Sequence, residues 1–101
     1  MNSNFDILIS FRTPSGFKVC AQYFLGRDPE LAETVFAGLS GKDDISDNAV
    51  LHLDLVETRD ELPVKVKTIG CRLSELCANC QHITRELFRA NAISAGEDHP
   101  F

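Results

Sequence analysis

The sequence predicts an α+β fold: a tandem ββα repeat whose four strands form one antiparallel sheet, with two helices packed on one of its faces. Three observations predict it. Residues 5–39 and 49–91 each run as strand, turn, strand, glycine and helix. The glycine that ends the second strand recurs as Gly26 and Gly70, a spacing in the range of internal repeats. Apolar residues alternate before each glycine and fall at 3–4 spacing after it. We therefore expect one pseudo-duplicated domain over residues 1–101.

The first unit begins with a hairpin and ends with a short helix. Residues 5–11 and 17–25 alternate in polarity around the turn signal Thr13-Pro14-Ser15-Gly16. The helix is expected to begin after Asp28, a good N-cap, with Pro29 at its first position. Its apolar stripe is predicted to contain Leu31, Val35 and Leu39, flanked by Ala32 and Phe36.

The second unit follows a polar linker at residues 40–48. Strands at 49–56 and from Pro63 onward flank a charged turn at 57–61. The second helix is expected from about Leu73 to about Asn91, with a frayed tail at 94–101. Its inner face is predicted to carry Leu73, Leu76, Cys80, Ile83, Leu87 and Ala90, with Cys77, Thr84 and Phe88 beside them. Its outer face is predicted to carry Glu75, Asn79, His82, Glu86 and Arg89.

The strand order follows from chain direction. The helix after the second strand returns the chain to the start of that strand, so the third strand runs antiparallel to the first. Order 2-1-3-4 then makes the whole sheet antiparallel, whereas order 1-2-3-4 needs a parallel pair through a right-handed crossover. Pro63 and the lysines Lys65 and Lys67 suit an edge strand, which favours 2-1-3-4.

Composition excludes several classes of function. The apolar fraction of 44% and the charged fraction of 25% are those of an ordinary globular domain. The formal charge of −5 disfavours binding to nucleic acid, which would have to use Arg72, Arg85, Arg89, Lys65 and Lys67. The sequence contains neither a signal peptide nor an apolar stretch long enough for a membrane span, so a cytoplasmic location is expected.

Three of the four cysteines lie at or in the second helix. Cys77 and Cys80 are about 60° apart on the apolar stripe, while His82 is on the opposite side, so the three cannot share a zinc ion on a continuous helix. We expect both thiols to be buried and metal-free, behaving as small apolar groups. A metal site and a redox pair are the alternatives. Cys71, near the helix start beside Arg72, is the better candidate for a reactive thiol, although a small residue at a strand–helix corner is the simpler interpretation.

The sheet face opposite the helices is the predicted functional surface. It is expected to be partly apolar and partly charged, as in a protein interface with an apolar middle and a polar rim. No catalytic residue, metal ligand or cofactor is predicted, so we expect an interaction module rather than an enzyme, with a homo-oligomer or another protein as partner. The predicted interface residues are Leu8, Phe24, Val50 and Val56, on a face that also carries Asp6, Ser10, Lys18, Gln22, His52, Asp54, Lys65 and Lys67.

A small-ligand or enzyme site on the same face is the alternative. His52 and Asp54 are neighbours on one side of a strand, the arrangement of a carboxylate-oriented general base. Lys67 is expected on the adjacent strand. The three are the candidate ligand-binding residues, because they combine three polar chemistries with one group that titrates near neutrality.

Overall fold

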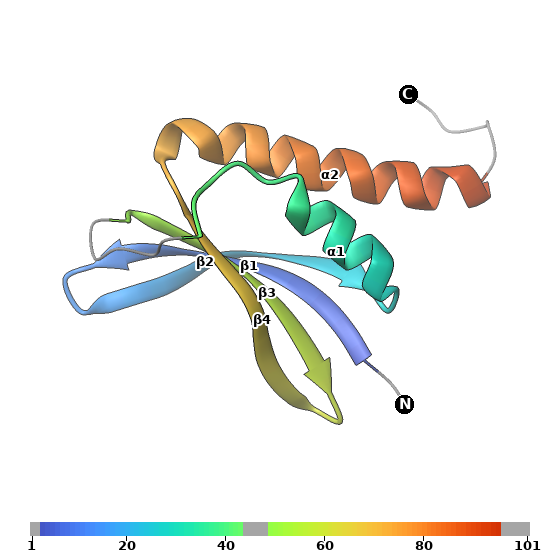
Figure 1. Cartoon of the computed structure of the whole chain (residues 1–101), viewed down its shortest axis with the longest axis horizontal. Helices are drawn as coiled ribbons and strands as arrows, with labels where there is room; N and C mark the ends of the chain where they lie inside the picture. The colour runs from blue at the N-terminus through green and yellow to red at the C-terminus, as the bar shows by residue number, and fades with distance from the viewer. Residues whose placement is uncertain (1–2, 44–48, 96–101) are drawn as a thin grey trace.

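The computed structural model describes residues 3–43 and 49–95 and has the element order ββαββα (Figure 1). The first hairpin consists of β1 (Ser3–Thr13) and β2 (Gly16–Gly26), and helix α1 (Pro29–Ala37) follows it. The second consists of β3 (Leu51–Arg59) and β4 (Leu62–Cys71), followed by α2 (Leu73–Ala95).

The four strands form one antiparallel sheet in the order β2-β1-β3-β4. The predicted fold class and strand order are confirmed, and the layout fits two ββα units. Several boundaries differ from prediction: β3 begins at Leu51 and the second hairpin turns at Asp60 and Glu61, both with positive φ. Helix α2 extends to Ala95, beyond the expected end near Asn91. The rest of the predicted tail and most of the acidic linker lie outside the described residues.

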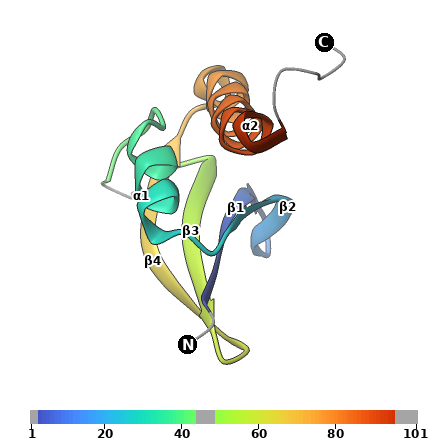
Figure 2. The ribbon, with the colours of Figure 1, turned by 90° about the vertical axis from the view of Figure 1, so that its right-hand side faces the viewer.

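Both helices lie on the same side of the sheet, which separates a covered face from an open one (Figure 2). The covered face of the two central strands is entirely apolar in its middle, where Ile7, Ile9, Leu53 and Leu55 are fully buried. These four side chains come from alternate positions of β1 and β3, as the period-2 pattern predicts. The helices close the core from above with Ala32, Val35, Phe36 and Ile83.

Helix α1 has the predicted N-terminus. The Asp28 carboxylate accepts a hydrogen bond of 2.9 Å from the Glu30 N–H, and Pro29 occupies the first turn, where its missing N–H costs nothing. The helix ends at Ala37, before the predicted Leu39, with Gly38 as its C-cap. A Cβ at position 38 would collide with the His82 ring, so glycine allows α2 to approach α1 here.

Asn79 of α2 anchors the helix to the loop that follows α1. Its side-chain carbonyl accepts from the Ser40 N–H at 2.7 Å, and its NH2 group donates to the Ser40 carbonyl at 2.9 Å. One turn along, His82 Nε2 donates to the Val35 carbonyl at 3.0 Å. Asn79 is only 1% exposed. The prediction that Asn79 and His82 lie on a solvated outer face is therefore wrong: both face α1 and its loop, because they satisfy main-chain groups there.

Because of these contacts, the buried side of α2 differs from the predicted one. Ile83 is fully buried, and Leu76, Cys80 and Leu87 are partly buried against the core. The two ends of the stripe, Leu73 and Ala90, are exposed instead. Cys77, Thr84 and Phe88 are exposed as well. Neither α1 nor α2, the helices of the described chain, carries an apolar stretch long enough to cross a bilayer.

Replacing Asn79 by alanine is expected to lower the free energy of unfolding by roughly 1–3 kcal/mol, because it removes two hydrogen bonds to Ser40 and leaves a void where a buried side chain was. The change is measured by urea denaturation. Gln81→Ala, on the same helix at an exposed position, is the matched control and should cost less than about 0.5 kcal/mol. Equal costs for the two variants would contradict the anchoring role.

Candidate interaction surface

The open face is a grid of side chains from β1, β2 and β3. On β1 it displays Asp6, Leu8, Ser10 and Arg12, which alternate with the buried Phe5, Ile7 and Ile9. On β3 it displays His52, Asp54 and Val56, and Val50 just before the strand continues the series, since its carbonyl accepts from the Arg12 N–H. The cross-strand rows are Phe17–Arg12–Val50, Val19–Ser10–His52, Gln22–Leu8–Asp54 and Phe24–Asp6–Val56.

A β-bulge in β2 determines which of its residues reach this face. Ile9 pairs with Ala21 and Ser10 with Val19, so Cys20 is the extra residue. The alternation reverses at this point. Phe17 and Val19 lie on the open face, and Lys18, opposite Phe11, lies on the covered side. The prediction that Lys18 belongs to the open face is therefore wrong.

A second bulge has the same effect in β4. Leu55 pairs with Lys67 and Val56 with Lys65, which leaves Val66 as the extra residue. Lys67 consequently lies on the covered side, where its ammonium group donates to the Glu33 carboxylate of α1 at 2.6 Å. The sequence-predicted trio of His52, Asp54 and Lys67 is not brought together, whereas Lys65 does reach the open face.

The Asp54 carboxylate interacts with two side chains of strand β4. The Thr68 hydroxyl donates to one carboxylate oxygen at 2.5 Å, and the Lys65 ammonium lies 3.8 Å from the other. The residue is only 4% exposed, although α1 and α2 both lie on the other side of the sheet. Asp54 thus has the partners that a buried carboxylate requires.

The His52 ring of β3 stacks on the Phe17 ring of β2. The ring centroids are 3.9 Å apart and the planes are inclined by 12°. The Arg12 guanidinium lies 5.8 Å from the Phe17 centroid, so a cation, a benzene ring and an imidazole form one group. His52 Nε2 is buried without a hydrogen-bond partner. Burial lowers the pKa of His52 below its usual value, while the Asp54 carboxylate opposes this and Lys65 and Arg12 add to it.

The open face exposes large apolar side chains at both ends of the strands. Phe24 is 72% exposed, Val19 54%, Val50 44% and Phe17 41%. Of the four predicted interface residues, Phe24 and Val50 are thus accessible, Leu8 is half-buried and Val56 is nearly buried at 7%. Sequence analysis missed Phe17, Val19 and Arg12, since a regular alternation assigns both Phe17 and Val19 to the core.

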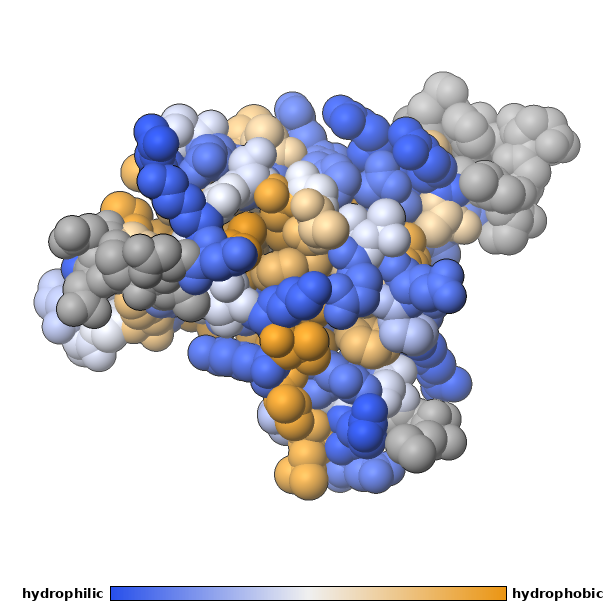
Figure 3. Space-filling view, in the orientation of Figure 1, coloured by the Kyte–Doolittle hydropathy of each residue, from blue (hydrophilic) through white to orange (hydrophobic). Residues whose placement is uncertain are grey.

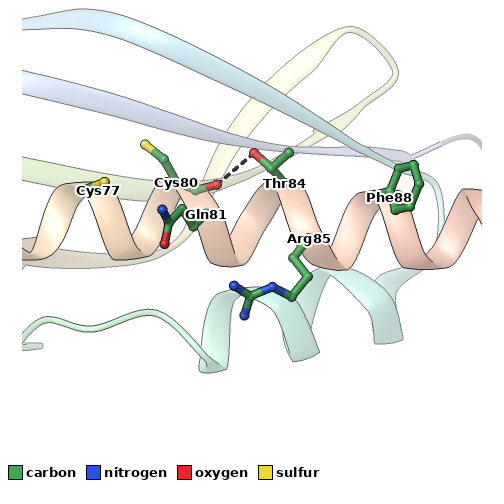
Figure 4. Close-up of a pocket in the computed structure, with 6 residues that line it drawn as sticks. All are labelled: Cys77, Cys80, Gln81, Thr84, Arg85 and Phe88. Atoms are coloured by element: carbon green, nitrogen blue, oxygen red, sulfur yellow. Dashed lines mark hydrogen bonds between the residues drawn. The ribbon is translucent and has the colours of Figure 1, made fainter. Parts of the chain in front are cut away.

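A shallow groove runs along α2 and is lined by Cys77, Cys80, Gln81, Thr84, Arg85 and Phe88. Figure 4 shows Cys80, Thr84 and Phe88 along one edge of the helix and Arg85 on the other. The Thr84 hydroxyl donates to the Cys80 carbonyl at 2.8 Å, so it is used within the helix. The groove places two thiols beside apolar surface.

The thiols differ in environment, and one prediction about them is wrong. Cys77 is exposed rather than buried, because the rotation of α2 turns it away from the core. Cys80 is half-buried, and its hydrogen bond with Tyr23 raises the pKa of that phenol. Cys71 is buried at the strand–helix corner, and burial raises the pKa of its thiol, which opposes the reactive role considered for it. Within the described part of the chain, no three potential ligand side chains lie close enough to hold a metal ion.

Another exposed apolar group lies on the tip of the β3–β4 hairpin, which projects at the bottom of Figure 3 with apolar side chains in orange. It consists of Leu62, Val64 and Val66, which are 69%, 58% and 41% exposed. These residues lie on the covered side or at the bulge and do not continue the open face.

Comparisons with family models, with curated proteins and with solved structures find no match to this chain.

The lowered pKa of the half-buried His52 predicts a pH dependence of stability. Because its pKa is lower in the folded state than the usual 6.5, the unfolded chain binds more protons, and the free energy of unfolding should fall as the pH drops below about 6.5. His52→Phe keeps an aromatic ring against Phe17 and removes the titration. Urea denaturation of dilute protein between pH 7.5 and 5 should show a smaller loss for the variant. Parallel profiles would contradict this assignment.

The solvent exposure of each cysteine side chain also predicts the order in which the thiols react. Native-state titration with a disulfide reagent should label Cys20 and Cys77 first and Cys71 last, because the first two are exposed and the third is buried. Cys77→Ala should remove one fast-reacting thiol and change stability by less than about 0.5 kcal/mol. Cys71→Ala should leave the fast phase intact and cost roughly 1 kcal/mol. Slow labelling of Cys77 would restore the original core assignment.

Proposed function

We propose that this protein is an interaction module that self-associates through the open face of its sheet. The single observation that carries the proposal is the set of large apolar side chains displayed there, namely Phe17, Val19, Phe24 and Val50. Exposed apolar groups gathered on one face, with charged residues among them, are typical of protein-binding surfaces. The helices cover the other face, so this one is available to a partner.

Two carboxylates of the open face, Asp54 and Asp6, are compatible with burial against a partner. Asp54 already has Thr68 and Lys65, and Asp6 accepts from Gln22 Nε2 at 2.6 Å. A partner that covers these groups would therefore leave them satisfied, which removes a cost that often opposes association. Aromatic residues and an arginine stand among the apolar groups, the residue types enriched at interfaces.

The alternative of a small-ligand or enzyme site loses one of its three residues. His52 and Asp54 share the open face, but Lys67 lies on the other side of the sheet, bound to Glu33. Asp54 is also engaged by Thr68 and Lys65. These contacts favour the interaction surface over a site built on the three residues. The cytoplasmic location stays a prediction from the sequence.

Sedimentation equilibrium over a range of concentrations tests the proposal. The wild-type protein should be a dimer at high micromolar concentration, and Phe24→Lys should raise its dissociation constant tenfold or more, roughly the loss expected when a large aromatic contact is replaced by a charge. Leu62→Lys is the matched control, because Leu62 is about as exposed but lies at the hairpin tip off the open face. A monomeric wild-type protein at all concentrations, or equal effects of the two substitutions, would refute the proposal.

A further inference from the structure

The open face has an internal symmetry that specifies how two copies would meet. Ile9 of β1 pairs with Leu53 of β3 and with Ala21 of β2, so these three residues form one cross-strand row. Asp6 and Arg12 lie three residues to either side of Ile9. Val50 and Val56 lie three residues to either side of Leu53. On β2, the rows of Arg12 and Asp6 end in Phe17 and Phe24.

Residues of matching or complementary chemistry therefore stand at equal distances from this row. About 10 Å from the row on either side, each strand carries a corresponding residue: an aromatic residue at both positions on β2, a valine at both positions near β3, and a cation at one and an anion at the other on β1. In the rows nearer the axis, His52 corresponds to Asp54, whereas Ser10 with Leu8 and Val19 with Gln22 are pairs of unlike chemistry, so the pattern holds in the outer rows and at His52. The edge strand β4 does not follow the pattern, since it contributes Lys65 in the Asp6 row and ends at Cys71 before the opposite row.

We infer, resting on the proposed function, that the partner is a second copy of this chain, stacked face to face about a twofold axis that runs across the strands over the row Ala21–Ile9–Leu53. Such an axis reverses the strand direction and keeps each strand over its own copy. Arg12 then faces Asp6 of the other copy, twice per dimer. Phe17 faces Phe24, and Val50 faces Val56. The contact is isologous, as a twofold dimer requires.

Charge complementarity selects this arrangement over the other twofold that stacks the sheets. An axis along the strands would keep their direction and place the Arg12 ends of the two copies together, and likewise the Asp6 ends, so that like charges met. Opposite charges at the two ends of β1 favour the antiparallel arrangement. The twist of the two sheets would incline the strands by about 30°, which is the usual aligned packing.

The contact is small. It extends about 20 Å along the strands and about 15 Å across β2, β1 and β3, so each copy contributes about 300 Å² of flat area, less than the roughly 800 Å² of a standard interface and typical of a weak, transient contact. We therefore expect a dissociation constant in the micromolar range, and association must be measured up to high micromolar concentration.

Paired charge reversal tests the arrangement. Asp6→Arg alone would set two guanidinium groups against each other across the axis, and Arg12→Asp alone would set two carboxylates against each other. Each should raise the dissociation constant tenfold or more at low salt. The double variant D6R/R12D restores opposite charges across the axis and should return to within about threefold of the wild-type value. Lys18→Glu, a reversal on the covered side of the same hairpin, should leave association unchanged. Circular dichroism and thermal melts establish that each variant is folded.

The outcomes separate the two levels of the proposal. Suppose that the wild-type protein dimerises and that Phe24→Lys abolishes dimerisation, but that the double variant D6R/R12D binds no better than the single variants. The open face is then the interface, and the twofold arrangement is overturned. Rescue by the double variant supports the twofold directly, because a loss of folding or of the Gln22–Asp6 contact would not be repaired by a second reversal on the same strand. A wild-type protein that never dimerises overturns both.

Discussion

The two hydrogen bonds between the Asn79 side chain and the Ser40 main chain determine the arrangement of the helical layer. They tie α2 to the loop that follows α1, and the His82–Val35 bond reinforces them one turn along. Because this face of α2 is fixed, Ile83 closes the core and Cys77 is turned to solvent. Helices α1 and α2 lie together on one side of the sheet, and no described helix lies on the other side.

Much of the fold could be predicted because local chemistry and global pattern agree. Asp28 and Pro29 mark a helix start by backbone chemistry alone, and the alternation of Ile7 and Ile9 assigns a covered face without knowledge of the tertiary structure. The strand order followed from chain direction. The packing side of α2 could not be predicted in the same way, since polar Asn79 is buried through a contact with Ser40, far away in the sequence.

The composition of the candidate surface was harder to predict than the fold. A single extra residue reverses the facing of every residue beyond it, and neither Cys20 nor Val66 carries a residue type that marks a bulge. The predicted side of the sheet was therefore correct on the central strands, at Leu8, His52 and Asp54, and on the edge strands it was wrong only across the bulges, at Lys18 and Lys67. Central strands are constrained by neighbours on both sides, whereas an edge strand accommodates a bulge more readily.

The bulges in β2 and β4 also affect whether the sheet can be extended by strands from other molecules. An edge strand with regular main-chain spacing offers a template for another strand, and growth in that direction has no natural limit. Here β2 is interrupted at Cys20 and Leu25, and β4 at Val66, so neither edge presents an unbroken ladder of N–H and C=O groups. Irregular edges of this kind are poorer templates for a further strand than regular ones. The proposed association through the open face differs, because a twofold contact uses the same surface of both copies and would give a closed dimer rather than a polymer.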